Sequence, residues 1–274
     1  NVDRDEIFRT NVDGTATVLA LADQLGVEAF HHVSTAYVAG HRSGVIGERM
    51  PDGQRDTNNL YELSKIEAEL LVGAAAGRFA VNVFRPSIVV GHGGTRAATT
   101  FTGLYGFTRQ LVRMSRTSRS QLSGWLSRKP VKILAEPDTP LNLIPVDLVA
   151  RQAVALARAG CSGRVAHLSN ATPTTVGAAI GTIFDRLDLH PPTYVDSRDE
   201  FNVIDSEFHR EMNFYNSYLS GEKWFEQSTA REFGLAPLAY DFSPPVLRSF
   251  YDWYLDRLFA PLGAGSEAAE AVGG

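Results

Sequence analysis

The sequence predicts an α/β fold, in which part of a doubly wound parallel sheet carries a smaller, mostly helical lobe. From residue 5 to residue 91, helical and strand-like patterns alternate, and this order and spacing are typical of parallel strands joined by crossover helices. The chain of 274 residues is also 44% hydrophobic, which is enough for a large core. We therefore expect a sheet covered by helices.

The first elements can be placed from periodicity and from the residues that end them. A helix is predicted over residues 5–25, because apolar side chains recur at helical spacing and Gly26 follows. A short buried strand is expected over 29–35, and a second helix over 59–76, after a polar, glycine-rich loop. The inner side of the second helix is expected to carry Leu60, Leu63, Ile66, Leu70 and Leu71. The stretch FAVNVFRP then forms a strand that stops at Pro86, and SIVVG leads into a glycine-rich loop.

The alternation is less regular in the rest of the chain. Helices are predicted in TTFTGLYGFTRQLVRM and TTVGAAIGTIFDRLDL, a strand in RVAHLSN, and a strand, a turn and a long helix in VKILAEPDTPLNLIPVDLVARQAVALARA. The aromatic-rich region 201–259 is expected to be mostly helical. We assign residues 1–95 and 140–170 to the sheet core, residues 96–139 and 171–262 to the lobe, and residues 263–274 to a disordered tail.

Composition excludes several classes of protein. Cys161 is the only cysteine, which excludes intrachain disulfides and cysteine-rich metal sites. No metal site is predicted from the histidines either, because the adjacent His31 and His32 face opposite sides of a strand. No run of eighteen apolar residues and no signal peptide is visible, so a soluble, cytoplasmic protein is expected. Peripheral contact with a membrane stays open.

Charge is distributed unevenly along the chain. The net charge is -5, yet residues 70–135 contain ten Arg and Lys and no Asp or Glu, so the remainder is near -15. An ordinary solvated face is one interpretation of such a segment, and an anionic partner is the other. Nucleic acid is not expected as that partner, because the acidic remainder of the surface would repel it.

Tyr61 and Lys65 are the first candidates for chemistry. In the stretch YELSK they lie four residues apart at the start of a helix, which places both side chains on one face. A nearby ammonium favours the phenolate and lowers the tyrosine pKa, so the pair could give or take a proton near neutral pH. The alternative is a surface turn of a helix.

Polar residues also gather where the predicted strands end. Thr35, in VSTAYVAG, ends the strand before Tyr61, and FRPSIVVG follows at the end of the next strand. Such strand ends lie side by side at the carboxyl edge of a parallel sheet, where ligands bind. The stretch NVDGT interrupts the first helix with poor helix formers, and Asn11 could point its amide at the same edge.

The stretches NVDGT, VSTAYVAG, YELSK and FRPSIVVG, in this order and spacing, resemble the extended short-chain dehydrogenase/reductase superfamily, which has a Rossmann-like NAD(P)-binding core. Within it, HHVSTAYVAG, LNLIPVDLVA and RVAHLSN are similar to the male-sterility type, which comprises fatty acyl-CoA reductases and thioester reductase domains. FYNSYLSGEKWFEQSTAREF is loosely similar to the region after the core of fatty acyl-CoA reductases. The resemblance covers residues 1–170 well and residues 214–233 faintly.

The resemblance implies a role for each matching position. Tyr61 would be the catalytic acid, Lys65 would bind the nicotinamide ribose, and Thr35 would hydrogen-bond the substrate carbonyl, with Ser34 on the opposite strand face. The cofactor would be NADPH, with NADH as the alternative. The residues expected to line it are Asn11, Val33, Lys65, Pro86, Ser87 and Ile88.

The chain departs from the family pattern at its beginning. It starts with Asn1, inside a helical pattern, and lacks the family's G-x-x-G-x-x-G after a first strand. We therefore expect an upstream nucleotide-binding segment, without which residues 1–274 would not bind NADPH in the micromolar range. Gly91, Gly93 and Gly94 are similar to the glycines of a phosphate-binding loop, but they follow a late strand. We interpret this segment as a loop on the substrate side.

Three functions remain open at this point. The leading one is an NAD(P)H-dependent reductase that takes an acyl thioester, on coenzyme A or on a carrier protein, to an aldehyde or an alcohol. The second keeps the fold with another substrate, as in a sugar-nucleotide epimerase or dehydratase or a hydroxysteroid-type dehydrogenase. The apolar stretch FTGLYGF favours a lipid-like substrate over a sugar. The third is an inactive remnant or binding module.

Overall fold

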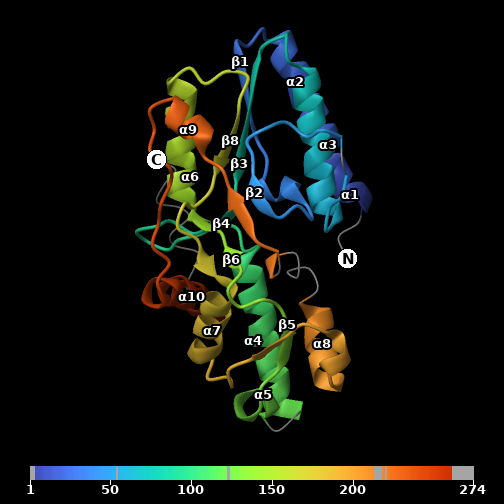
Figure 1. The fold of residues 1–274 in the computed structure, drawn as a ribbon, viewed down its shortest axis with the longest axis vertical. Coiled ribbons are helices and arrows are strands. Elements are labelled where there is room, and N and C mark those ends of the chain that lie inside the picture. The colour runs from blue at the N-terminus through green and yellow to red at the C-terminus, as the bar shows by residue number, and fades with distance from the viewer. Residues whose placement is uncertain (1–3, 54, 122–123, 213–217, 220, 261–274) are drawn as a thin grey trace.

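The computed structural model describes residues 4–53, 55–121, 124–212, 218–219 and 221–260, and the predicted tail lies outside them. Its centre is a parallel three-stranded sheet in the order β1-β3-β8, formed by β1 (Ala29–Val33), β3 (Ala80–Pro86) and β8 (Val165–Leu168). Figure 1 shows α2 (Gly14–Gln24) and α3 (Leu60–Ala74) on one side of this sheet. The predicted α/β fold with parallel strands is confirmed.

Each face of the sheet has its own apolar core. On one face, Val81 and Val83 of β3 pack with Leu19 of α2 and Val72 of α3. On the other face, Phe84 and Leu168 pack with Leu156 of α6 (Val146–Arg158). Alternating side chains of the strands thus hold helices against both faces, as expected for a doubly wound sheet.

The first helix is continuous but changes its winding in the middle. α1 (Arg4–Phe8) passes into a π-helical turn at Arg9–Asp13, and α2 follows directly. Directly after this turn, the hydroxyl of Thr15 in α2 donates to the carbonyl oxygen of Asn11 across 2.6 Å. The helix predicted over 5–25 is therefore present. Asn11 and Asp13 of NVDGT lie in the widened turn, a feature often found at functional sites, and Gly14 and Thr15 begin α2.

Strand β1 differs from the buried strand expected over 29–35. Only His32 among its five residues is buried, while the Val33 side chain is 56% exposed. The reason is its position in the sheet, because β1 pairs with β3 alone among the described strands and therefore forms an edge. His31 and His32 do lie on opposite faces, one exposed and one buried.

Helix α3 begins at Leu60 behind a side-chain cap. The Asn59 side chain accepts from the Glu62 backbone N–H across 2.9 Å, and the Glu62 carboxylate accepts from the Asn58 N–H. Of the five apolar residues expected on its inner side, only Ile66 is buried, and Leu60 is 39% exposed. The other buried positions are Glu62, Ser64, Ala68, Glu69 and Val72. Polar side chains could take inner positions because the chain supplies hydrogen-bond partners for them.

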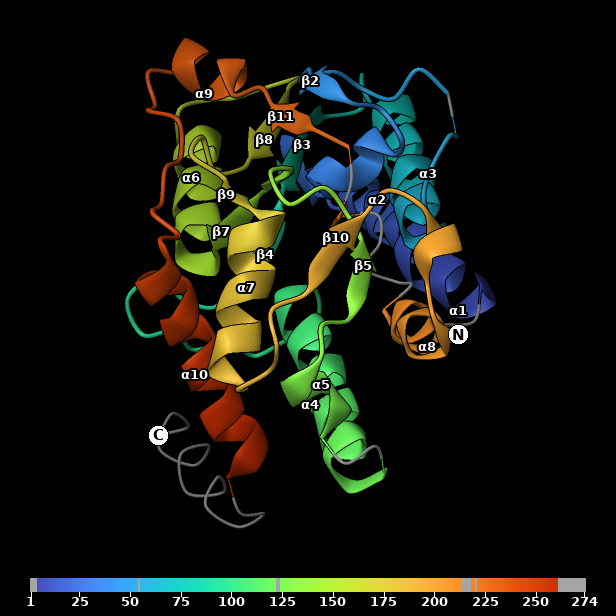
Figure 2. The ribbon, with the colours of Figure 1, turned by 60° about the horizontal axis from the view of Figure 1, so that its bottom comes forward.

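The remaining elements form the helical lobe and short strand pairs. The helices among them are α4 (Leu104–Gln121), α5 (Trp125–Arg128), α7 (Val176–Arg186), α8 (Val203–Glu211), α9 (Ser228–Glu232) and α10 (Pro244–Phe259). The strands are β2 (Gly44–Ile46), β4 (Ile88–Val90), β5 (Lys132–Leu134), β6 (Pro140–Leu141), β7 (Leu143–Pro145), β9 (Thr174–Thr175), β10 (Thr193–Val195) and β11 (Lys223–Phe225). Helices α4, α7 and α10 share one apolar core, and Figure 2 shows β5 beside β10.

Two segments differ from the sequence-based expectation. The region 201–259 contains the predicted helices but also β11, which pairs in parallel with β2. The segment before α3, expected to be a polar, glycine-rich loop, contains β2 and a buried 3-10 helix at Ala36–Ala39. The β2–β11 pair joins segments far apart in the sequence and packs Phe225 edge-on against Tyr37.

Candidate active site

Thr35, Tyr61 and Lys65 meet at the carboxyl end of β1. Tyr61 and Lys65 lie one turn apart in α3, and Thr35 follows β1 directly. The Tyr61 phenol is hydrogen-bonded to the Thr35 side chain. Lys65 Nζ donates to the carbonyl oxygen of Val33 across 2.9 Å. The structure therefore brings together the three residues for which the sequence predicts catalytic roles.

The electrostatics of Tyr61 differ from the expectation. Burial raises the pKa of Tyr61 above its usual value, the neighbouring Glu62 raises it further, and only the hydrogen bond with Thr35 lowers it. The expected lowering by Lys65 is wrong for this state, because the ammonium is directed to the Val33 carbonyl and burial outweighs the other influences. Tyr61 is thus a protonated phenol at neutral pH, the form that can donate a proton.

Lys65 is itself partly desolvated. Burial lowers the pKa of the Lys65 ammonium, and the charge of Glu69, one turn further along α3, opposes this shift. Glu69 is in turn held by a buried pair with Arg85, in which Arg85 Nε lies 2.9 Å and the second guanidinium nitrogen 2.5 Å from the carboxylate oxygens. Tyr61, Lys65 and Glu69 therefore follow one line along the helix.

The loop after Thr35 is folded tightly around this cluster. The Thr35 hydroxyl oxygen accepts from the Tyr37 backbone N–H across 3.2 Å and so caps the 3-10 helix. Gly40 closes the loop at φ +58°, where a Cβ would approach the Asp56 carbonyl oxygen to 2.0 Å. The requirement for glycine at this close approach explains the last residue of VSTAYVAG.

Asn11 reaches α3 from the π-helical turn. Its amide Nδ2 donates to the Ser64 hydroxyl across 2.9 Å, and that hydroxyl donates to the Tyr61 carbonyl oxygen across 2.8 Å. The widened turn thus ties the first helix to the backbone of α3 beside the predicted acid. Its predicted contact with a cofactor stays a prediction.

Pro86, Ser87 and Ile88 lie where β3 passes into β4. The Ser87 N–H donates to the Leu168 carbonyl oxygen across 3.3 Å, and the Ser87 side chain is buried. Its hydroxyl has no hydrogen-bond partner within the described part of the chain. Ile88 borders the apolar cavity described below. The predicted cofactor-lining segment therefore carries one buried hydroxyl able to bind a ligand.

The glycine-rich loop 91–94 is not arranged as a phosphate cradle. The Gly91 N–H donates to the Tyr105 hydroxyl across 2.9 Å, the Gly93 N–H to the Asp147 carboxylate across 2.7 Å, and the Gly94 N–H to His92 Nδ1 across 3.0 Å. A phosphate would have to displace these acceptors and would face a carboxylate. The spacing of the glycines in the sequence predicted that this loop is not a phosphate-binding loop, and the observed geometry agrees. Its role on the substrate side stays a prediction.

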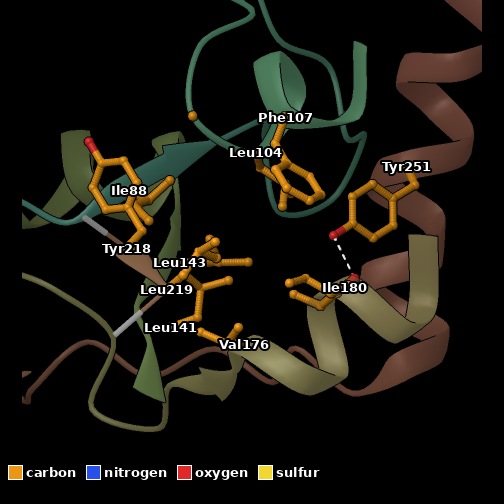
Figure 3. Close-up of a pocket in the computed structure, with 12 residues that line it drawn as sticks. Ile88, Leu104, Phe107, Leu141, Leu143, Val176, Ile180, Tyr218, Leu219 and Tyr251 are labelled. Atoms are coloured by element: carbon orange, nitrogen blue, oxygen red, sulfur yellow. Dashed lines mark hydrogen bonds between the residues drawn. The ribbon is translucent and has the colours of Figure 1, made fainter. Parts of the chain in front are cut away.

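An apolar cavity opens in the lobe below this edge of the sheet (Figure 3). Counting its open mouth, it encloses about 440 Å³ between α4, α7, α10 and the β6–β7 segment. The side chains labelled in Figure 3 are Ile88, Leu104, Phe107, Leu141, Leu143, Val176, Ile180, Tyr218, Leu219 and Tyr251. The Tyr251 hydroxyl donates to the Ala179 carbonyl oxygen across 3.0 Å and so adds no free polar group.

The cavity is connected to the Thr35–Tyr61–Lys65 cluster through an aromatic contact. Tyr218 lines the cavity and packs edge-on against Tyr37, with ring centroids 4.6 Å apart. Tyr37 is the residue whose N–H binds Thr35. Among the cavity walls, sequence reasoning singled out FTGLYGF as apolar and Ile88 as cofactor-lining. It missed the contributions of α7, α10 and Tyr218, because these come from segments distant in sequence.

A comparison with known protein families identifies the family of this chain. Residues 1–153 match the family model described as male sterility protein. The chain belongs to the male-sterility family. The resemblance to this type of extended short-chain dehydrogenase/reductase is therefore confirmed. A comparison with curated proteins gave no match.

Solved structures share the fold of this family member. The terminal R domain from the myxalamid PKS-NRPS biosynthetic pathway has 22% sequence identity and a TM-score of 0.68, over 92% of this chain and 64% of that one. UDP-glucuronic acid 4-epimerase from Bacillus cereus, in complex with NAD, has 15% identity and a TM-score of 0.60, over 91% and 68%. DesIV, a dTDP-glucose 4,6-dehydratase from Streptomyces venezuelae, has 19% identity and a TM-score of 0.60, over 91% and 66%. This chain thus spans about two thirds of their lengths.

A nicotinamide cofactor, which this family binds, suits the residues at the carboxyl edge of the sheet. The Lys65 ammonium, the Asn11 amide and the unpartnered Ser87 hydroxyl are polar groups at that edge. Among the described residues, no group of His, Cys, Asp and Glu is arranged to hold a metal ion. None of the described helices combines the length and the apolar character that crossing a membrane requires.

Proposed function

We propose that this protein is an NADPH-dependent reductase of acyl thioesters, carried on coenzyme A or on a carrier protein, with an aldehyde or an alcohol as product. One observation carries the proposal: Tyr218, in the wall of an apolar cavity, packs against Tyr37, whose backbone N–H binds Thr35 of the Thr35–Tyr61–Lys65 cluster. An acyl chain would fill this cavity, and its thioester carbonyl would lie toward Thr35 and Tyr61. NADPH is proposed from the family resemblance, and NADH is the alternative.

In the proposed reduction, each of these residues has a task. When bound, the cofactor supplies the hydride that adds to the carbonyl carbon. The Thr35 and Tyr61 hydroxyls donate hydrogen bonds to the carbonyl oxygen as it gains negative charge, because preorganised donors stabilise such an oxyanion. Tyr61, held protonated by its raised pKa, then gives its proton to that oxygen. As the C–S bond of the adduct breaks, the oxygen re-forms a carbonyl and its proton passes to the departing sulfur, so that an aldehyde and a free thiol leave. Lys65 binds the ribose, and Asn11, Val33, Pro86, Ser87 and Ile88 line the cofactor.

The exposed arginines of α4 suit the anionic part of such a substrate. Arg109, Arg113 and Arg116 recur at helical spacing on one exposed face of α4, and the Arg116 guanidinium lies 4.7 Å from the centroid of the Phe259 ring. The first turn of this helix contributes Leu104 to the cavity wall. Coenzyme A phosphates or an acidic carrier protein would therefore meet positive charge on the helix that also borders the acyl chain.

A sugar-nucleotide epimerase or dehydratase is the second candidate, since an epimerase and a dehydratase of this kind share the fold. Its substrate needs hydrogen-bonding groups for several hydroxyls. The cavity offers few, because ten of its twelve lining residues have no polar side-chain atom and the Tyr251 hydroxyl is already bonded. The cavity chemistry therefore favours the lipid-like substrate.

The proposal is tested with the full-length gene product. Oxidation of NADPH is followed with a series of acyl-CoA substrates of increasing chain length and, in parallel, with UDP-glucose and dTDP-glucose. Thioester-dependent oxidation with release of free thiol supports the proposal. Conversion of a sugar nucleotide without any thioester reduction would overturn it and establish the second candidate.

A further inference from the structure

Lys223, the first residue of β11, is a buried lysine. Only 7% of the residue is exposed. Within the described part of the chain, its ammonium makes no hydrogen bond and no ion pair. Burial lowers the pKa of this ammonium, and the charge of Glu62 opposes the shift. Because lysine is almost never fully buried unless it is paired, a buried ammonium with unused donors requires an explanation.

The alternation of side chains along β11 fixes the direction of Lys223. Lys223 and Phe225 share one face of this strand, and Trp224 lies on the other. Trp224 is 47% exposed, whereas Phe225 packs edge-on against Tyr37, with ring centroids 5.7 Å apart. Figure 2 shows β11 beside β2, with which it pairs in parallel. Lys223 therefore lies on the inner face of this strand pair, toward the loop that follows Thr35.

The Glu62 carboxylate balances the charge of Lys223 without pairing directly with it. Its Oε2 accepts from the Asn58 backbone N–H across 2.9 Å and from the Asn58 side-chain amide across 3.0 Å. These N–H donors bind the ionised form of the carboxyl group, which can only accept. Burial raises the pKa of Glu62, whereas the Asn58 bonds and the charge of Lys223 lower it. Lys223 is thus neutralised from a distance, and its N–H groups stay available to a ligand.

The Tyr37 hydroxyl is a second polar group near Glu62 that makes no hydrogen bond to the described residues. Burial raises the pKa of Tyr37 well above its usual value, and Tyr218 and Glu62 raise it further, so the phenol is protonated at neutral pH and can donate. Ser34 Oγ, which also lacks a partner, is fully enclosed by protein, but neither Tyr37 Oη nor Lys223 Nζ is enclosed to that extent. Both atoms can therefore be reached from solvent.

Tyr218 marks the boundary between these polar groups and the apolar cavity. Its ring lines the cavity and packs edge-on against Tyr37, with ring centroids 4.6 Å apart. Figure 3 shows its hydroxyl directed away from the apolar side chains of the cavity. A Cβ placed on Gly221 would stand 3.6 Å from Lys223 Nζ, so the ammonium lies close to the same segment of chain. The polar groups therefore adjoin the cavity on the side of Tyr218 that carries its hydroxyl.

The charge balance indicates which ligand suits this place. Lys223 and Glu62 together carry no net charge, so an anion would be attracted by the ammonium and repelled by the carboxylate. A neutral oxygen acceptor avoids that repulsion and can accept from both the ammonium and the Tyr37 hydroxyl. With an acyl chain in the cavity and its carbonyl at Thr35 and Tyr61, the thiol arm of the substrate would extend to this side. On coenzyme A and on carrier proteins alike, that arm is pantetheine, a neutral chain with amide groups.

We propose that Lys223 and Tyr37 form a polar subsite that binds an amide carbonyl oxygen of the substrate's thiol arm. The Lys223 ammonium and the Tyr37 hydroxyl both donate to this oxygen, and Glu62 keeps the subsite neutral. The subsite makes the enzyme selective for thioesters whose thiol carries an amide. The identity of the ligand rests on the proposed reductase function.

The subsite is tested with two thioesters that share one acyl group, S-hexanoyl-pantetheine and S-ethyl hexanethioate, which lacks the amides. In the full-length gene product, Lys223→Met should raise KM for the pantetheine thioester roughly tenfold, the size expected for a hydrogen bond from a charged donor. KM for the ethyl thioester should stay unchanged. Equal increases for both thioesters would show that Lys223 only supports the fold, and no increase for either would show that it does not touch the substrate.

Lys132→Met is the matched control. It makes the same chemical change at the first residue of another short strand, where the ammonium donates to the Glu200 carbonyl oxygen across 2.7 Å. KM for both thioesters should stay at the wild-type value in this variant.

Tyr37→Phe tests the second donor of the subsite. It keeps the aromatic ring and the backbone N–H that binds Thr35. KM for S-hexanoyl-pantetheine should rise roughly threefold, because a neutral hydrogen bond contributes less than a charged one. An unchanged KM would exclude the hydroxyl from the subsite.

A binding measurement separates this inference from the proposed reaction. S-hexyl-pantetheine is a thioether that cannot be reduced, and calorimetric titration of the full-length gene product measures its affinity. The affinity should fall roughly tenfold in Lys223→Met and stay unchanged in Lys132→Met. If thioesters are not reduced but this difference is found, the proposed reaction is wrong and the subsite stands. If thioesters are reduced but Lys223→Met binds the thioether as wild type does, the subsite is wrong and the proposed function stands.

Discussion

Lys65 Nζ lies 2.9 Å from the carbonyl oxygen of Val33, and this contact holds α3 to the end of strand β1. The contact orients the ammonium toward the strand end rather than toward the Tyr61 phenol. It also keeps Lys65 at the edge where its charge influences His32. The predicted acid and the predicted ribose ligand are thereby positioned by two different groups, Thr35 for the acid and the Val33 backbone for the lysine.

The first prediction concerns Tyr61 as the proton donor. Tyr61→Phe removes the hydroxyl and little volume, so kcat should fall by about 10²- to 10⁴-fold while cofactor affinity and the melting temperature stay close to wild type. Steady-state kinetics and calorimetric titration of the full-length gene product measure both. Lys65→Ala serves as the comparison, because it should weaken cofactor binding as well. Wild-type turnover in Tyr61→Phe would show that another group donates the proton.

The second prediction concerns the pH dependence of stability. Burial lowers the pKa of His32 and of His167 from 6.5 to about 4, so the unfolded chain binds more protons than the folded one between these values. The contribution of the two histidines to the free energy of unfolding should therefore be complete above pH 6.5. It should fall as the pH drops toward 4, by up to about 3 kcal/mol for each histidine. Urea unfolding at several pH values measures this slope.

A variant separates the histidines from other acid-sensitive groups. His167→Gln removes one titrating ring and should reduce the slope between pH 4 and 6.5 by about half of the histidine contribution, at some loss of stability at neutral pH. A slope equal to that of wild type would mean that His167 is solvated or protonated in the folded state, contrary to its burial.

The sequence was sufficient for features that depend on local patterns. The order of the main helices and strands and the meeting of Thr35 with Tyr61 follow from motifs that lie along one stretch of chain or at adjacent ends of parallel strands. The direction of the Tyr61 pKa could not be predicted from spacing to Lys65, because it depends on how far the phenol is buried.

Long-range packing explains the rest of what sequence reasoning missed. Strand β11 forms only because it pairs with β2, and Lys223–Phe225 carries no strong strand pattern by itself. Glu62 and Glu69 appear as surface residues of a helix until Asn58 and Arg85 are seen to bind them. The cavity likewise has walls from α4, α7 and α10, and no local motif marks their convergence.

The third prediction concerns the arginine face of α4. Arg113→Glu together with Arg116→Glu should raise KM for the thioester roughly fivefold and flatten its dependence on salt, because an anionic substrate or carrier would lose its attraction. Arg151→Glu with Arg158→Glu on the exposed side of α6 makes the same change in net charge away from this face and is the control. Equal KM values in both double variants would identify the α4 arginines as an ordinary solvated surface.

The fourth prediction concerns the cavity as the acyl-chain site. Ile180→Ala enlarges the cavity, so the preferred acyl chain should become longer by roughly two to three carbons, in proportion to the side-chain volume removed. Ile183→Ala on the same helix is the matched control, because Ile183 is equally buried but does not line the cavity. Both variants should lose about 2–4 kcal/mol of stability, because each removes a buried side chain. The effect of lost packing is therefore the same in the two variants. Only Ile180→Ala should shift the dependence of kcat/KM on chain length. If both variants shift it equally, or neither does, the acyl chain lies elsewhere and the lobe cavity has another occupant.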